Sequence, residues 1–220
     1  MSRQTSLKKE GKEHRFPLGE DLIGDKQGVL LVTYAGSTEA SANRVLEVLG
    51  DVPVLEICTG IGGGTVILSR LFSKVITIDQ ESSRLKYAKK NVGLYGNLAS
   101  VTFLEGNALE QSTIVNVEKV EPSIQCVFSD VDWREDDAKD LKDTVHNLDD
   151  TRPSMRLLYK SYEKFTKNWV MHLPKTISRK DLNVFGEVEV EECYYDGTIR
   201  FVNVYTGELF RKSLSKLYLN

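Results

Sequence analysis

The stretch Glu56-Ile57-Cys58-Thr59-Gly60-Ile61-Gly62-Gly63-Gly64-Thr65 decides the fold of this chain. It follows the apolar run VPVLEIC (52–58) and leads into TVILSRLF (65–72), which is typical of a strand, a glycine loop and a helix in succession. Glycine lets the backbone approach a ligand closely, and the free N–H groups of a helix N-terminus bind negative or polar groups. The stretch therefore predicts a ligand-binding loop in an α/β fold.

Strand and helix patterns alternate around this loop. Five apolar runs predict buried strands, at 52–58, 74–79, 101–106, 124–130 and 169–173. Helical spacing occurs after Ser37, at 65–72, at 82–95 behind Ser82 as N-cap, and from Pro153 to Thr166. Two last strands, 186–195 and 198–205, meet at Asp196-Gly197, which is a strong hairpin signal. The order predicts an α/β, Rossmann-like domain, with a mostly parallel seven-stranded sheet and a C-terminal antiparallel hairpin.

The composition is that of an ordinary globular protein. The chain has 220 residues, of which 40% are hydrophobic and 28% charged, and its net charge of −3 gives no overall basic field. We expect a partly flexible N-terminal extension over residues 1–27 and a single domain over 28–220. The first residues lack the apolar segment of a signal peptide, and no apolar run approaches the ~18 residues of a membrane-spanning helix. We therefore expect a cytoplasmic protein without a membrane partner.

The cysteines and histidines give no sign of a disulfide framework or a metal site. Cys58, Cys126 and Cys193 form no C-x-x-C pair, and the three histidines are far apart in the sequence. Cys58 and Cys126 fall inside apolar runs and are expected to be buried small hydrophobic residues.

Two ligands compete for the glycine loop. A dinucleotide fingerprint, G-x-G-x-x-G counted from Gly60, would need a glycine where Thr65 stands. Glu56 can accept hydrogen bonds from an ammonium group, which S-adenosylmethionine has and NAD lacks. Asp79 ends the second expected strand, where a carboxylate suits the ribose diol of either ligand. We therefore predict S-adenosylmethionine, with a purely structural turn as the alternative.

The third expected strand ends at Glu105-Gly106-Asn107-Ala108. The Asn107 amide can both donate and accept hydrogen bonds, so it can meet the amino group of adenine. Asparagine at a strand end is also an ordinary turn residue, and the local sequence leaves both interpretations open.

The fourth expected strand ends at Phe128-Ser129-Asp130-Val131-Asp132-Trp133. An exocyclic amine of a base is a poor nucleophile because its lone pair is delocalised into the ring. The Asp130 carboxylate and the Val131 carbonyl could accept its two N–H bonds, and Trp133 could stack on the base. We predict Asp130, Asp132 and Trp133 as catalytic residues, with an acidic loop and a sheet-covering tryptophan as the alternative.

From Gly28 to Arg211 the chain resembles the trimethylguanosine synthase family of RNA cap guanine-N2 methyltransferases, and in its compactness it looks more like the family's prokaryotic members. The family's acid-x-x-x-G-x-G-G-x-T loop is met by Glu56, Gly60, Gly62, Gly63 and Thr65. Its second strand is similar to Val75-Ile76 with Ile78-Asp79, its Leu-Pro-Arg to Leu173-Pro174-Lys175, and its closing hairpin to Val190–Tyr205. The resemblance implies a class I methyltransferase that uses S-adenosylmethionine and acts on guanine N2 of RNA without a metal.

The resemblance also implies that the early segment, Gly28 through Thr33, helps to enclose the cofactor. The predicted cofactor-binding residues come from the ends of successive strands and from that segment: Thr33, Glu56, Thr59, Gly60, Gly62, Thr65, Asp79, Gln80, Asn107, Ala108 and Asp130.

The substrate side departs from the family pattern. Asp130-Val131-Asp132-Trp133 stands where the family has Ser-Pro-Pro-Trp, Arg134-Glu135-Asp136 replaces Gly-Gly-Pro, and Val29-Leu30 replaces an aromatic pair. Arg134, Lys175, Arg179 and Lys180 are candidates for a phosphate-binding rim. An RNA methyltransferase is the leading hypothesis. A methyltransferase for DNA or a small molecule and a non-catalytic cofactor-binding protein remain as alternatives.

Overall fold

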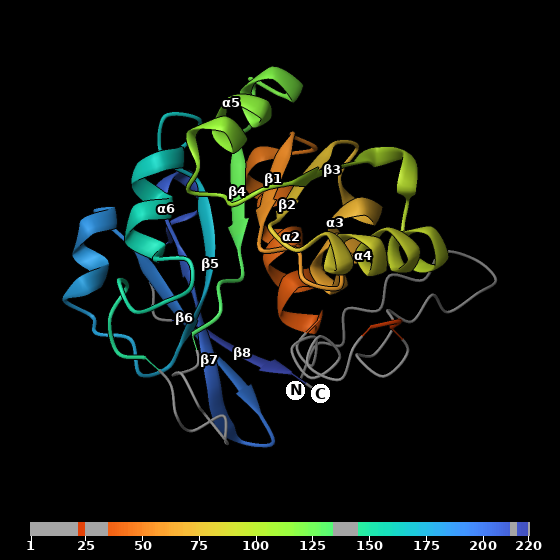
Figure 1. Ribbon diagram of the computed structural model, residues 1–220. Helices are drawn as coiled ribbons and strands as arrows, with labels where there is room; N and C mark the ends of the chain where they lie inside the picture. Colours follow the sequence, from red (N-terminus) through yellow and green to blue (C-terminus); the bar gives the residue numbers. More distant parts are fainter. Residues whose placement is uncertain (1–21, 25–34, 134–144, 212–214, 220) are drawn as a thin grey trace.

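A computed structural model describes residues 22–24, 35–133, 145–211 and 215–219 of the chain. Within them, eight strands form one sheet in the order β3-β2-β1-β4-β5-β7-β6-β8 (Figure 1). The strands are β1 (Val54–Ile57), β2 (Val75–Asp79), β3 (Val101–Glu105), β4 (Cys126–Ser129), β5 (Trp169–Pro174), β6 (Glu189–Tyr195), β7 (Thr198–Tyr205) and β8 (Ser215–Leu219). The helices are α2 (Ala35–Leu49), α3 (Gly63–Leu71), α4 (Ser82–Tyr95), α5 (Gln111–Val120) and α6 (Met155–Tyr162).

The sheet is mostly parallel, as the sequence predicts. Strands β3, β2, β1, β4 and β5 run parallel, whereas β7 pairs antiparallel with both β5 and β6. The hairpin turn at Asp196-Gly197 has φ values of 49° and 70°, which is the left-handed backbone that an Asp-Gly hairpin requires. The Rossmann-like α/β fold predicted from the sequence, with its C-terminal antiparallel hairpin, is therefore confirmed.

Helices cover both faces of the sheet. Side chains of α5 and α6 pack with one face of β1, β4 and β5 in a core cluster that includes Ile57, Val127 and Trp169. Side chains of α2 and α3 pack on the other face with Val54 and Phe128. Because both faces are covered, every residue of β1, β2 and β4 is buried, which is why these strands are mostly apolar in sequence.

The count of seven strands was wrong by one. Strand β8 pairs in parallel with β6 at the edge of the sheet. Its sequence, SKLYL, has only five residues, and two of them are polar. Such an edge strand is half exposed and lacks the apolar run by which the other strands can be recognised.

Several element boundaries also differ from the prediction. Helix α3 begins inside the glycine run at Gly63, and the N-cap of α4 is Glu81 rather than Ser82. Helix α6 is shorter than Pro153 to Thr166, because the Ser154 hydroxyl accepts a hydrogen bond from the Leu157 N–H and so starts the helix at Met155. The expected domain boundary at residue 28 lies outside the described residues. No helix in the described part of the chain is long and apolar enough to cross a bilayer.

Candidate functional site

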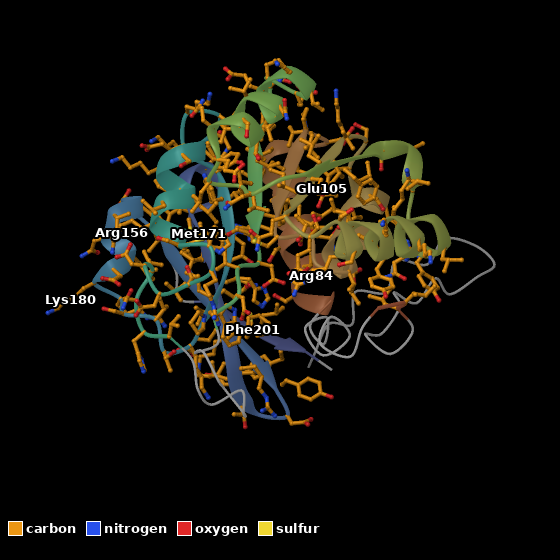
Figure 2. The ribbon with its side chains drawn as sticks, viewed as in Figure 1. Arg84, Glu105, Arg156, Met171, Lys180 and Phe201 are labelled. Atoms are coloured by element: carbon orange, nitrogen blue, oxygen red, sulfur yellow. The ribbon has the colours of Figure 1, made fainter. Side chains whose placement is uncertain are left out.

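A cavity of about 680 Å³ opens at the carboxyl ends of the parallel strands. Its walls come from the loops that follow β1, β2, β3 and β4, from α2, and from residues 151–154. Cavities of roughly 300–1,000 Å³ hold small ligands and cofactors, and in open α/β sheets they lie at this edge. In Figure 2, Arg84 on α4, which lines the cavity, and Phe201 on β7 flank the central region into which these loops converge.

The glycine loop turns sharply between β1 and α3. Cys58, Gly60 and Gly62 all have positive φ values, of 70°, 54° and 88°. A Cβ on Gly62 would lie 2.7 Å from the Cα of Ala88, so this glycine permits both the turn and the close contact between α3 and α4. Gly60 and Thr59 line the cavity, whereas Gly62 does not.

Cys58 differs from its expected role. It is only partly buried and lines the cavity, while Cys126 is buried as predicted. The surrounding protein, together with the charges of Asp79 and Asp130, raises the pKa of the Cys58 thiol. The thiol therefore stays protonated and contributes a polarizable wall rather than a nucleophile.

Glu56 lies at the base of the cavity and is 6% exposed. Its Oε2 accepts hydrogen bonds from the hydroxyls of Thr65 and Thr77, each at 2.5 Å. Burial raises the pKa of Glu56 to about 7, against the effect of these two bonds, and the charges of Asp130 and Asp79 raise it further. Thr65 is itself fully buried and does not line the cavity, so it orients Glu56 instead of facing a ligand.

Gly64, the glycine after the turn, leaves room for the carboxyl group of Glu56. A Cβ on Gly64 would lie 2.5 Å from Oε1 of Glu56. Only a residue without a side chain lets the first turn of α3 pass this carboxyl group, which accounts for the glycine at this position.

Asp79 is held in one orientation at the end of β2. Its Oδ2 accepts the Gly60 N–H at 2.8 Å, and its Oδ1 accepts the Glu81 N–H at 2.9 Å. Burial nevertheless raises the pKa of Asp79 above its ordinary value. The carboxylate and the neighbouring Gln80 line the cavity, where a ribose diol could donate to the remaining lone pairs.

The loop after β3 combines the two roles that the sequence left open. The Asn107 side chain accepts the Leu109 N–H at 2.9 Å, which is the local turn expected of asparagine. Asn107 and Ala108 also line the cavity, and the Ala108 carbonyl accepts a bond from the Tyr162 hydroxyl at 2.9 Å. The turn therefore presents both residues to a ligand from a fixed backbone.

The loop after β4 brings the three predicted catalytic side chains to the same cavity. Asp130, Asp132 and Trp133 all line it. Asp130 is exposed to the cavity, and the protein packed around it, with Asp132 as a second cause, raises its pKa. Trp133 is partly buried and packs against the core cluster under α5 and α6.

Asp132 pairs with Arg152, which the sequence did not indicate as part of the site. Its backbone N–H and C=O pair with those of Arg152 at 3.0 and 2.7 Å, and the two side chains approach to 4.0 Å. Arg152 also lines the cavity, so a cation stands beside the acidic loop. This contact fixes the loop backbone on both sides of Asp132.

One wall of the cavity comes from residues that the sequence did not indicate. Thr38 and Ser41 on α2, His172 on β5 and Asn203 on β7 also line it. The His172 ring lies 3.9 Å from the Phe201 ring, and burial lowers the pKa of His172 to about 4, so the imidazole is neutral near pH 7. One feature of the sequence could have indicated His172: it is a polar residue at an inward-facing position of an otherwise apolar strand.

Some of the residues that the sequence predicts to act at the site are not among the described residues. Thr33, with the segment Gly28–Thr33, lies outside them, as do Arg134, Glu135 and Asp136. Within residues 22–24, 35–133, 145–211 and 215–219, no three His, Cys, Asp or Glu side chains gather in a way that could hold a metal ion.

Comparisons with known proteins bear on the same region of the chain. A sequence profile described as RNA cap guanine-N2 methyltransferase matches residues 52–209, which include β1 to β7 and most of the cavity wall. The chain is 25% identical over 166 residues to trimethylguanosine synthase of Schizosaccharomyces pombe, which covers 74% of this chain and 67% of that protein.

Solved structures share the fold. A methyltransferase from Porphyromonas gingivalis W83 superposes with a TM-score of 0.65 at 15% identity, over 84% of this chain and 43% of that one, so this chain spans less than half of that protein. M. capricolum TrmK, solved with S-adenosyl-homocysteine, superposes with a TM-score of 0.51 at 13% identity, over 82% of this chain and 71% of that one. At these identities the likeness shows the fold alone.

Proposed function

This chain belongs to the RNA cap guanine-N2 methyltransferase family and is an S-adenosylmethionine-dependent methyltransferase, and we propose from this premise that it methylates an exocyclic amine, guanine N2, in RNA. The observation that carries the proposal is that Asp130 and Trp133 line the same cavity as the glycine loop. A base-binding pair and a cofactor loop around one cavity are what a direct transfer between two bound molecules requires.

The cavity residues fit the cofactor. Glu56 would hold the ammonium of the methionine part, Asp79 and Gln80 the ribose, and Asn107 with Ala108 the adenine. Thr59 and Gly60 would line the side of the cavity next to the cofactor, Gly62 and Thr65 would support that loop from behind, and Asp130 would border the methyl group. Thr33 is proposed only from the family resemblance, as part of the segment that helps to enclose the cofactor. The three carboxylates Glu56, Asp79 and Asp130 favour a cationic ligand over a neutral one.

The loop after β4 would act on the amine. When bound, S-adenosylmethionine supplies a methyl carbon that leaves its sulfonium sulfur as the amine nitrogen bonds to it. The Asp130 carboxylate and the Val131 carbonyl would accept the two amine N–H bonds and localise the nitrogen lone pair. The raised pKa of Asp130 suits a group that then takes up the proton lost from nitrogen.

Trp133 and Asp132 would position the base. Trp133 packs on the core on one side and reaches the cavity on the other, which suits a ring that stacks on guanine. Asp132 is held to Arg152, so it would set the loop geometry while Arg152 faces an RNA phosphate.

The experiment compares two transcripts of one sequence, one containing guanosine and the other inosine in its place. Inosine lacks the exocyclic amine, so we expect methyl transfer from labelled cofactor to the first transcript only, with N2-methylguanosine identified by mass spectrometry after nuclease digestion. Equal methylation of both transcripts would show that the methylated atom is not the exocyclic nitrogen of guanine. Transfer to DNA but not RNA would replace the proposed substrate, and binding of cofactor with no transfer to either would favour a non-catalytic protein.

A further inference from the structure

Two stacked tyrosines lie on the last two strands of the sheet, β6 and β8, outside the cavity. Tyr194 on β6 and Tyr218 on β8 are register partners, and their rings lie 5.1 Å apart at 25°. Tyr218 is 66% exposed. The Lys216 ammonium lies 5.5 Å from the centre of the Tyr194 ring. We call Tyr194, Tyr218, Lys216 and the nearby Lys175 the tyrosine platform.

The platform is held rigidly enough to present its rings. The Tyr194 hydroxyl donates to Glu192 at 2.8 Å, and the backbone of Tyr194 is fixed between Ile199 of β7 and Tyr218 of β8. Glu192 offsets one of the two lysine charges. What remains is the exposed ring of Tyr218, supported from behind by Tyr194, with a positive charge at its side, which suits ligands that have both aromatic rings and phosphates.

A series of contacts connects the platform with the candidate site. The Trp133 carbonyl accepts the Val145 N–H at 3.0 Å, and the Val145 carbonyl accepts the Thr176 hydroxyl at 2.8 Å. Lys175, next along the chain, donates to the Ile199 carbonyl at 3.1 Å, and Ile199 pairs with Tyr194. A series of hydrogen bonds and strand pairs therefore links the platform to Trp133 in the cavity wall.

The direction of the strands places the platform at the same edge as the cavity. Tyr194 and Tyr218 stand at the carboxyl ends of β6 and β8, and β6 runs parallel to β4 and β5, where the cavity opens. Figure 1 shows the β6–β7 hairpin and β8 beyond the carboxyl end of β4. Four strand spacings of ~4.8 Å separate β4, which leads into the loop of Asp130 and Trp133, from β8, about 19 Å in all. That span corresponds to about five to six nucleotides at the ~3.4 Å spacing of a stacked strand.

We propose that the tyrosine platform binds single-stranded RNA a few nucleotides away from the one that enters the cavity. A base would stack on the exposed face of the Tyr218 ring, whose other face meets Tyr194, and phosphates would lie against Lys216 and Lys175. Stacking on exposed rings tolerates any base, so the platform adds affinity without reading sequence. The choice of RNA as the occupant rests on the proposed function.

The test measures the affinity of a fluorescein-labelled, single-stranded RNA of mixed sequence by anisotropy, with S-adenosyl-homocysteine present. Tyr218→Leu should weaken binding about tenfold, because leucine has no π-face, whereas Tyr218→Phe should bind as the wild type does. Lys216→Ala should weaken binding and lower the slope of log affinity against log salt by about 0.7. Lys89→Ala, an exposed lysine on α4, is the matched control and should change neither quantity.

The outcomes separate the platform from the proposed function. Unchanged RNA affinity in Tyr218→Leu, with methylation of guanosine intact, overturns the platform alone. Platform-dependent RNA binding by a protein that methylates no guanosine supports the platform and removes the proposed function. A dimer in sedimentation velocity that Tyr218→Leu dissolves, without an effect on RNA, would assign this face to a second copy of the chain and overturn the proposal.

Discussion

The glycine loop after β1 and the acidic loop after β4 border one cavity but are built in different ways. On the cofactor side, Glu56 accepts two threonine hydroxyls, and Asp79 accepts two backbone N–H groups. On the substrate side, the structure gives the Asp130 carboxylate no hydrogen bond within the described part of the chain. The proposed cofactor groups Glu56 and Asp79 are therefore held in one orientation by the protein itself, and the proposed catalytic Asp130 is not held by any described residue in this way.

The two sides are coupled through charge. Glu56, Asp79 and Asp130 each raise the pKa of at least one other group in the cavity, which shows that they share a single electrostatic environment. A cationic ligand relieves this repulsion and a neutral one does not. The cavity should therefore hold the charged methyl donor more tightly than its neutral thioether product.

The largest effect on the cofactor side is expected from Asp79→Ala. Loss of the ribose hydrogen bonds should weaken S-adenosyl-homocysteine binding by roughly 1–3 kcal/mol, measured by calorimetry. Asp51→Ala is the matched control, because Asp51 also accepts a backbone N–H, from Ser73 at 2.8 Å, but lies outside the cavity. Unchanged affinity in Asp79→Ala would remove Asp79 from the cofactor site.

A smaller effect is expected from pH, through Glu56. Its pKa is about 7 in the free protein, and a bound ammonium favours the ionised form. Binding must therefore release a proton below pH 7, and the affinity for S-adenosyl-homocysteine should fall as pH decreases from 8 to 6, by up to about tenfold per unit below the pKa.

The Glu56 prediction is checked with Glu56→Gln, which should flatten this pH dependence. Glu121→Gln should leave it as in the wild type, because Lys74 holds the pKa of Glu121 at about 2, so Glu121 does not titrate in this range. A wild-type affinity that is constant between pH 6 and 8 would mean that Glu56 does not face the ammonium.

The cofactor side was the more predictable from sequence. Glu56, Gly60 and Asp79 belong to one strand-loop-helix-strand unit, so their spacing alone indicates that they meet. The place of Asn107 can be predicted in the same way, because it comes after β3, the strand next to β2.

The residues on the substrate side could not all be predicted in this way. Arg152, His172 and Asn203 reach the cavity from three distant segments, and a single sequence gives no reason to bring them together. Helix α5 was also missed, although Thr113, Ile114 and Val117 stand at helical spacing and are buried.

The most direct test of the separation between the two sides is Asp130→Asn, with the rate of methyl transfer at saturating cofactor and RNA measured beside the affinity for S-adenosyl-homocysteine. Asn removes the charge that accepts the amine proton but keeps the size of the side chain. The rate should fall by about 100-fold or more, while the affinity changes by no more than about threefold. Asp150→Asn, on an exposed turn, should behave as the wild type does. A rate that survives the substitution, or a rate and an affinity that fall together, would contradict the assignment of Asp130 to catalysis.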